Sequence, residues 1–128
     1  QAAQLMRDEH VGDLIVIETR EGRTVPIGVV TDRDIVVEVV AKGVDPTDVT
    51  VGDAMSSDLL SVHEDNGIEY ALREMQRMGV RRVPVVNEKG ALTGVLAIDD
   101  VLEHLALELT RIAGAIRIER DKEIQSRP

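Results

Sequence analysis

The side chains that could catalyse a reaction or hold a metal ion are few in this sequence and poorly spaced for either task. The absence of cysteine excludes disulfides, thiolate nucleophiles and cysteine-ligated metal centres. His10, His63 and His104 lack the i, i+4 spacing of a helical zinc site. The sequence also lacks a serine–histidine–aspartate order, a glycine-rich phosphate loop and a dinucleotide fingerprint. We therefore expect no catalytic residue, no metal site and no enzyme activity.

Two short motifs are suited to binding instead. Thr31 ends a strand-like segment and Asp34 falls in the first turn of a helix-like one, where free backbone N–H groups favour anions. The same Thr-x-x-Asp pattern is also a capping box, which has a purely structural role. Arg81 and Arg82 suit phosphate oxygens, or are solvated charges at the end of a strand. By themselves, the two motifs leave both interpretations open.

The composition restricts the classes of partner. The 128 residues are 43% apolar, which suffices for one core or two small ones and not for a multidomain enzyme. A net charge of −9 argues against nucleic acid and anionic membranes, both of which attract basic surfaces. No apolar run approaches the roughly 18 residues of a membrane helix, and no signal-peptide pattern opens the chain. We therefore expect a cytoplasmic protein. Tyr70 is the sole aromatic residue, so aliphatic side chains would have to hold any flat ligand.

An internal repeat positions the two motifs. Met6 to Ile17 align with Met75 to Val86, and Gly28 to Ile35 align with Gly94 to Val101. The second copy predicts the order β-α-β-β-α, with strands at 59–63, 83–86 and 92–97 and a last helix from about Asp99. Its first helix is predicted to begin at a capping box of Asn66 and Glu69 and to end at Gly79.

The first copy predicts the same order from its helix onward, with strands at 14–17 and 26–30, a turn at 19–23 and a helix at 35–41. Gln1 aligns with Tyr70 in the middle of a helix, so the first copy has no counterpart to the opening strand. We expect that this sequence lacks the beginning of the natural chain. The alternative, a first repeat that is incomplete, would leave a sheet edge unpaired. The predicted division is repeat 1 at 1–50, repeat 2 at 51–110 and a helical tail at 111–128.

The repeat resembles the cystathionine-β-synthase (CBS) domain pair, or Bateman module. Three segments carry the resemblance: Gly28 to Ile35, Val51 to Met55 and Val80 to Val86. It implies an α/β (α+β) fold of tandem β-α-β-β-α repeats related by a pseudo-twofold axis, with two small sheets packed together and flanking helices. It also implies a regulatory module without catalytic activity that requires no cofactor. The expected ligands are AMP, ADP or ATP, with S-adenosylmethionine and NAD as further candidates.

The resemblance assigns the ligand-binding residues. In the family motif the Asp34 carboxylate would accept hydrogen bonds from the ribose hydroxyls, and Thr31 would reach ribose or phosphate, with Arg33 between them. A two-oxygen carboxylate suits a vicinal diol. The other repeat would complete the cleft with Arg81 and Arg82 for phosphate, Pro84 beside them and a further wall that includes Ser61 and His63. On the side of the first repeat, Val29 would contact the adenine.

A second cleft departs from the family pattern. Ala97 replaces the hydroxyl residue of the motif, although Asp100 keeps the carboxylate. Gly12 and Asp13 occupy the positions that Arg81 and Arg82 hold in the other copy, and an acidic side chain repels phosphate. We therefore expect two unequal sites. The one with Asp34 binds a phosphorylated nucleoside, and the weaker one with Asp100 is empty or specific for an uncharged ligand.

The last helix carries an apolar stripe that could pack against a symmetry mate, with positions Leu105, Leu109, Ile112, Ala113 and Ile116. Since isolated modules of the family commonly form flat discs of two modules, we expect a homodimer that acts on a partner protein of unspecified identity. The alternative is a structural dimerisation module whose clefts are vestigial.

Overall fold

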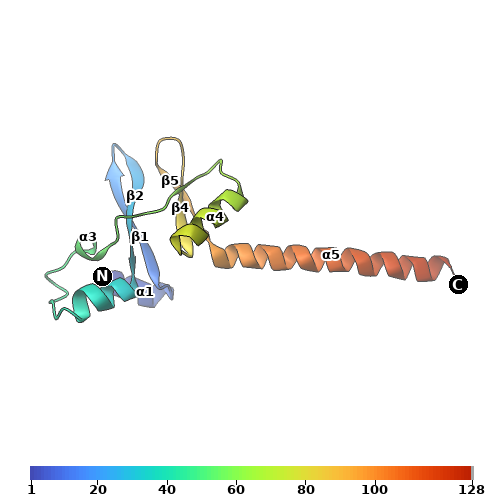
Figure 1. Cartoon of the computed structure of the whole chain (residues 1–128), viewed down its shortest axis with the longest axis horizontal. Helices are drawn as coiled ribbons and strands as arrows, with labels where there is room; N and C mark the ends of the chain where they lie inside the picture. The colour runs from blue at the N-terminus through green and yellow to red at the C-terminus, as the bar shows by residue number, and fades with distance from the viewer. Residues whose placement is uncertain (128) are drawn as a thin grey trace. The chain divides into compact units, whose positions relative to one another are not determined.

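The computed structural model describes residues 1–127, which form two compact units, one from Gln1 to Val95 and one from Leu96 onward. Helices are mixed with two small sheets, which is the predicted fold class. In chain order (Figure 1) the elements are α1 (Ala2–Glu9), β1 (Asp13–Arg20), β2 (Arg23–Thr31), α2 (Asp32–Asp34), the π-helical segment η1 (Ile35–Val40), α3 (Val51–Ala54), β3 (Val62–His63), α4 (Ile68–Met78), β4 (Arg82–Val86), β5 (Leu92–Ala97) and α5 (Ile98–Ser126).

The first sheet is the antiparallel hairpin of β1 and β2. Glu21 and Gly22 form its turn with φ values of 50° and 74°, the two positive values that a tight two-residue hairpin turn needs. Because this turn occupies only two residues, Arg20 pairs with Arg23, and both strands are longer than the sequence predicted. At the open end Asp13 pairs with Thr31, which brings two polar side chains together.

The second sheet has the strand order β3-β4-β5. Strand β5 has the predicted bounds, whereas β3 pairs with β4 only over Val62 and His63. The residues before Val62, which were predicted as strand, run outside the sheet. At the end of α4, Gly79 adopts the predicted left-handed conformation with φ 67°, and the Val80 N–H donates to the Met75 carbonyl at 3.1 Å.

The predicted capping box at the start of α4 is wrong. The helix begins at Ile68 after Gly67, which offers no side chain for capping. The Asn66 side-chain oxygen instead accepts a hydrogen bond from the His63 N–H at 2.8 Å. Asn66 therefore stabilises the turn between β3 and α4, a competing use of the same polar side chain.

Each repeat contributes a small apolar core. Met6, Val30 and Ala54 form a buried cluster, while Met75 and Val83 lie among the most buried side chains of the second repeat. Two of the four methionines, Met6 and Met75, are thus buried in the core, and Met55 and Met78 are partly buried. The segment that follows α3 is tied to β2, because Val29 and Ser56 exchange backbone hydrogen bonds of 3.0 and 2.8 Å.

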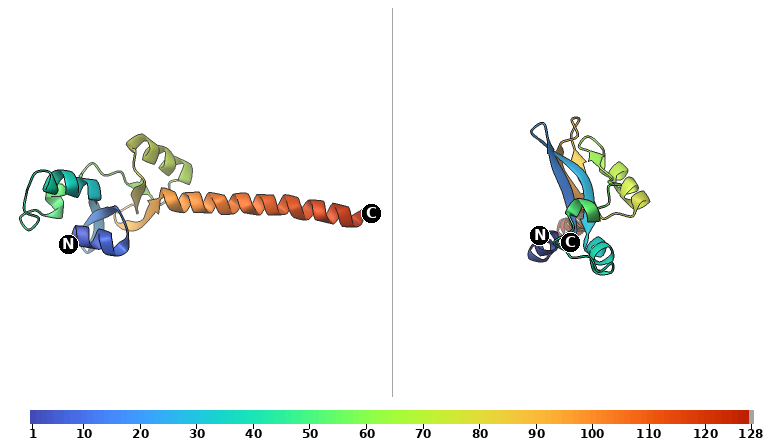
Figure 2. Two further views of the ribbon diagram at one scale, coloured as in Figure 1. Left: turned by 90° about the horizontal axis from the view of Figure 1, so that it is seen from below. Right: turned by 90° about the vertical axis from the view of Figure 1, so that its left-hand side faces the viewer.

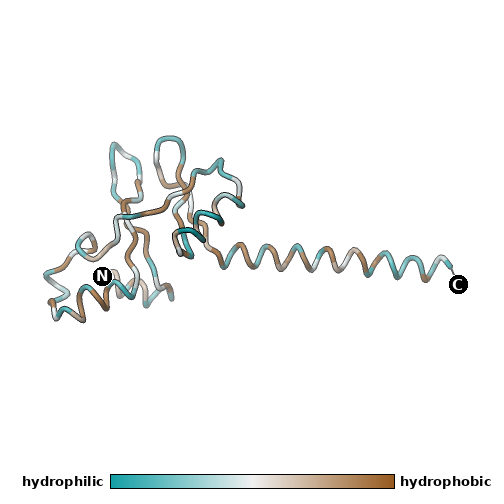
Figure 3. Tube along the Cα trace, in the orientation of Figure 1, coloured by the Kyte–Doolittle hydropathy of each residue, from teal (hydrophilic) through white to brown (hydrophobic). Residues whose placement is uncertain are grey.

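Helix α5 is one continuous helix (Figure 2), and apolar residues recur on its successive turns (Figure 3). It lies entirely in the second unit and includes the predicted tail as far as Ser126. Within residues 1–127, no helix combines the length and the apolar character needed to span a lipid bilayer.

Candidate ligand-binding pocket

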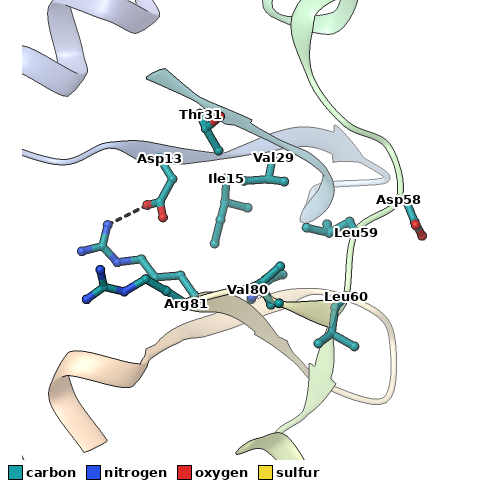
Figure 4. Close-up of a pocket in the computed structure, with 12 residues that line it drawn as sticks. Asp13, Ile15, Val29, Thr31, Asp58, Leu59, Leu60, Val80 and Arg81 are labelled. Atoms are coloured by element: carbon teal, nitrogen blue, oxygen red, sulfur yellow. Dashed lines mark hydrogen bonds and ion pairs between the residues drawn. The ribbon is translucent and has the colours of Figure 1, made fainter. Parts of the chain in front are cut away.

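A cavity of about 270 Å³ opens beside the hairpin β1–β2, and both repeats contribute to its wall. Hairpin residues form one side, the linker before β3 forms another, and the segment leading into β4 forms a third (Figure 4). The lining residues are Asp13, Ile15, Val29, Thr31, Asp58, Leu59, Leu60, Gly79, Val80, Arg81, Arg82 and Pro84. Most of this surface is apolar, and its charged groups are two arginines and two aspartates.

The hairpin register explains why its four lining residues face one way. Asp13 pairs with Thr31, and Ile15 pairs with Val29. Cross-strand partners project from the same face of a sheet, and residues two apart on a strand share that face. The intervening Val30 projects from the opposite face and is 1% exposed in the core. Successive side chains of β2 therefore point alternately into the core and into the pocket.

The same alternation shapes the wall from the second repeat. Arg82 and Pro84 line the pocket, while Val83 between them is 1% exposed and packs in the core. The left-handed Gly79 ends α4 and turns the chain, so that Val80 and Arg81 also reach the cavity. Strand β4 and the residues that lead into it thus supply both the aliphatic and the cationic parts of this wall.

An ion pair joins the two repeats at the polar end of the pocket. The Arg82 Nη1 donates to the Asp13 Oδ1 at 2.6 Å, and the two side chains are 32% and 28% exposed. Asp13 and Arg82 are equivalent positions in the internal repeat. In Figure 4, Thr31 and Arg81 lie near this pair, whereas Leu59 and Leu60 lie at the other end and Asp58 points away from the cavity.

Thr31 and Asp34 form a complete capping box at the start of α2. The Asp34 Oδ2 accepts hydrogen bonds from the Thr31 N–H at 2.8 Å and the Thr31 hydroxyl at 2.7 Å, and the Asp34 N–H donates to the Thr31 hydroxyl oxygen at 3.1 Å. Asp34 is partly buried and does not line the cavity, although Thr31 does. Both bonds that the carboxylate accepts end on Oδ2, and in the described part of the chain Oδ1 of Asp34 accepts none.

Several other predicted site residues lie outside the cavity. Arg33 is exposed beside the capping box, and Ser61 is exposed before β3. The His63 Nδ1 accepts a hydrogen bond from the Asp65 N–H at 3.3 Å. The wall expected from Ser61 to His63 is formed three residues earlier, by Asp58 to Leu60, because β3 starts only at Val62.

The residues that the sequence assigned to a second cleft do not lie together in a separate site. Asp13 lines the pocket described above and pairs with Arg82, so it does not stand apart in a separate site. The Gly12 carbonyl accepts a hydrogen bond from the Asp32 N–H at 2.9 Å, and Asp100 lies in the exposed first turn of α5. The sequence did not assign six of the lining residues to a binding site: Ile15, Asp58, Leu59, Leu60, Gly79 and Val80. The alternation of side chains along β1 could have indicated Ile15.

No group of three acidic or histidine side chains within residues 1–127 is close enough to hold a metal ion. The pocket therefore offers a ligand apolar surface, one hydroxyl and a charged end. These features suit a small organic molecule with a flat apolar part and a polar substituent.

Comparison with known proteins places the chain in a family. Residues 1–41 and 51–107 match the CBS domain, which covers both repeats. The chain belongs to the CBS domain family. The uncharacterized protein MK0525 of Methanopyrus kandleri is 33% identical over 103 residues, which are 80% of this CBS protein and 51% of MK0525. The chain thus spans about half the length of that relative.

Two solved structures share the CBS-pair fold. Hypoxic response protein 1 of Mycobacterium tuberculosis is 35% identical over 104 residues, 81% of this chain and 70% of that protein. The crystal structure of Hypoxic Response Protein I with two coordinated zinc ions matches with a TM-score of 0.68 and covers 80% of each chain. The CBS domain pair of protein MJ0100, solved with 5'-methylthioadenosine and S-adenosyl-L-methionine, has a TM-score of 0.66 at 20% identity and covers 84% of this chain and 80% of its own.

Proposed function

We propose that this CBS pair is a regulatory module that binds an adenosine-containing ligand in the pocket and has no catalytic activity. The observation that carries the proposal is the division of one cavity into an apolar part and a charged end, with Thr31 lining the cavity and donating its hydroxyl to its capping partner Asp34. Binding would shift the arrangement of the repeats by an amount set by the difference in affinity for the two states.

Aliphatic side chains would hold the adenine ring. Ile15 and Val29 on the hairpin oppose Val80 and Leu60 from the second repeat, and all four line the cavity. This assignment agrees with a chain in which Tyr70 is the sole aromatic residue. A flat base between aliphatic walls gains its affinity from burial of apolar surface.

The capping box would position the ribose-binding carboxylate. Thr31 fixes one oxygen of Asp34, and the remaining Oδ1 keeps its capacity to accept hydrogen bonds from a diol. Capping and ligand binding are therefore compatible uses of the same carboxylate. A preoriented acceptor costs less conformational entropy on binding than a mobile one.

The size of the cavity narrows the choice of ligand. A volume of about 270 Å³ lies just below the range of about 300–1,000 Å³ usual for ligand pockets. A mononucleoside ligand such as AMP, ADP, ATP or S-adenosylmethionine suits it better than the dinucleotide NAD. That the MJ0100 pair was solved with two adenosine derivatives supports the proposal at the level of the fold.

We propose a homodimer, with one module formed by the repeats at 1–50 and 51–110 and its helical tail following at 111–128. The support is the apolar stripe of α5, where Leu102, Leu105, Leu109 and Ile112 are each at least 50% exposed at alternating three- and four-residue spacing. Such a stripe is stabilised when a second helix covers it. Light scattering at micromolar concentration should give twice the mass of 14.0 kDa, and a monomer would contradict the proposal.

A thermal-shift panel tests ligand binding directly. AMP, ADP, ATP, S-adenosylmethionine and NAD are added separately, and a ligand that binds the folded state raises the melting temperature. At a concentration of 100 times Kd the gain is about 2.7 kcal/mol, which corresponds to several degrees. A flat response to all five compounds would favour the alternative of a dimerisation module with a vestigial pocket, in which the Asp13–Arg82 pair and the capping box serve only the fold.

A further inference from the structure

Arg82 already has an anionic partner where the sequence offered it to a ligand phosphate. Its guanidinium donates to the Asp13 carboxylate at 2.6 Å, and both side chains are about two-thirds buried. Solvent screens a partly buried pair less than an exposed one. The positive charge of Arg82 is therefore offset before any ligand enters.

A phosphorylated ligand would have to compete with Asp13. A phosphate that takes over Arg82 must displace the carboxylate and then lie beside it, and adjacent like charges repel each other. Asp58, the other acidic residue of the lining, points away from the cavity (Figure 4), so Asp13 is the acid that faces this end. A ligand whose substituent is uncharged leaves the Asp13–Arg82 pair intact.

We propose that Asp13 is a specificity-determining residue that makes the pocket discriminate against a phosphate on the ribose 5' carbon. The ligand class is then an adenosine derivative with an uncharged 5' substituent. This inference rests on the proposed function, because it requires that adenosine binds in this pocket. It replaces the expectation of AMP, ADP or ATP, which counted both Arg81 and Arg82 as phosphate-binding groups.

The test compares adenosine with AMP, two ligands that differ by one phosphate. Calorimetric titrations give the affinity ratio of AMP to adenosine for the wild type, Asp13→Asn and Arg82→Gln. The wild type should bind adenosine more tightly than AMP. Asp13→Asn should shift the ratio toward AMP by about tenfold, the factor that corresponds to 1.4 kcal/mol. Arg82→Gln should shift the ratio further toward adenosine.

The two substitutions are expected to shift the affinity ratio in opposite directions, which distinguishes an effect on specificity from damage to the fold. Both substitutions break the same ion pair, so an effect that comes only from lost structure would move the ratio in one direction for both. Asp8→Asn is the matched control, because it removes one carboxylate from the exposed Arg7–Asp8 pair, whose atoms are 2.9 Å apart and lie outside the pocket. It should leave the ratio unchanged.

Two further outcomes distinguish the inference from the function on which it rests. If adenosine binds and the ratio is the same in Asp13→Asn as in the wild type, Asp13 does not determine specificity, while the proposed function stands. If neither adenosine nor AMP binds to any of the four proteins, the proposed function fails and the inference fails with it.

Discussion

The chain contains the same Thr-x-x-Asp capping box twice, which provides a matched pair of substitutions. At the pocket, Asp34 Oδ2 accepts from the Thr31 N–H and hydroxyl at 2.8 and 2.7 Å. Before α3, Asp53 Oδ2 accepts from the Thr50 N–H and hydroxyl at 2.9 and 2.6 Å. The two boxes are locally alike, but only Thr31 lines the cavity. A role of Asp34 in binding can therefore be separated from its role in capping.

Replacing Asp34 with alanine should affect stability and affinity by different amounts. Asp34 is the third helical residue of the box and Thr31 is the N-cap, so the substitution removes the bonds from the Thr31 N–H and hydroxyl and keeps the N-cap bond. This loss costs about 1 kcal/mol, which lowers the melting temperature of a domain of this size by about 4 °C. A hydrogen bond to a charged acceptor is worth about 1.5–3 kcal/mol, so loss of one bond to the ribose should weaken binding roughly 10- to 150-fold. Asp53→Ala should also lower the melting temperature, because it removes the equivalent cap, but it should leave the dissociation constant unchanged.

Thermal unfolding and calorimetric titration with adenosine measure these two effects on the same preparations. The comparison uses the wild type, Asp34→Ala and Asp53→Ala. The reasoning is refuted if Asp34→Ala binds adenosine as tightly as the wild type does. It is refuted equally if Asp53→Ala loses as much affinity, since the loss would then follow from weakened folding.

Two further predictions concern the backbone and the pH dependence. A Cβ at Gly28 would lie 2.8 Å from the Ser56 carbonyl oxygen, so Gly28→Ala should lower the free energy of unfolding by about 1–3 kcal/mol, as measured with denaturant. Gly94 is the equivalent position of the other repeat and has open space around it, so Gly94→Ala should cost no stability. Equal losses would contradict the steric argument. The Thr50 hydroxyl and N–H hold the pKa of Asp53 below its ordinary value of 3.8, so the stability gained is present above pH 3.8 and is lost as pH falls through the lowered pKa. Thr50→Val should raise the Asp53 pKa in an NMR titration, and an unchanged midpoint would show that the hydroxyl has no such effect.

Local patterns made much of the fold predictable. The left-handed end of α4 at Gly79 and the burial of Met6 and Met75 follow from spacing within a few residues. The prediction failed where two local uses of one side chain compete. Asn66 could cap α4 or stabilise the preceding turn, and the hydrogen bond from the His63 N–H shows that it does the latter.

The amino-acid sequence by itself determined the repeat, the order of the elements and the family, because hydrophobic periodicity, turn residues and short motifs are properties of neighbouring positions. Only the tertiary structure decided that Asp13 pairs with Arg82 across the two repeats and that Asp58 to Leu60 form the pocket wall. Those outcomes depend on strand register and on where β3 begins to pair, which are set by contacts between distant segments. The charge that a ligand meets in this pocket is therefore a property of the folded chain.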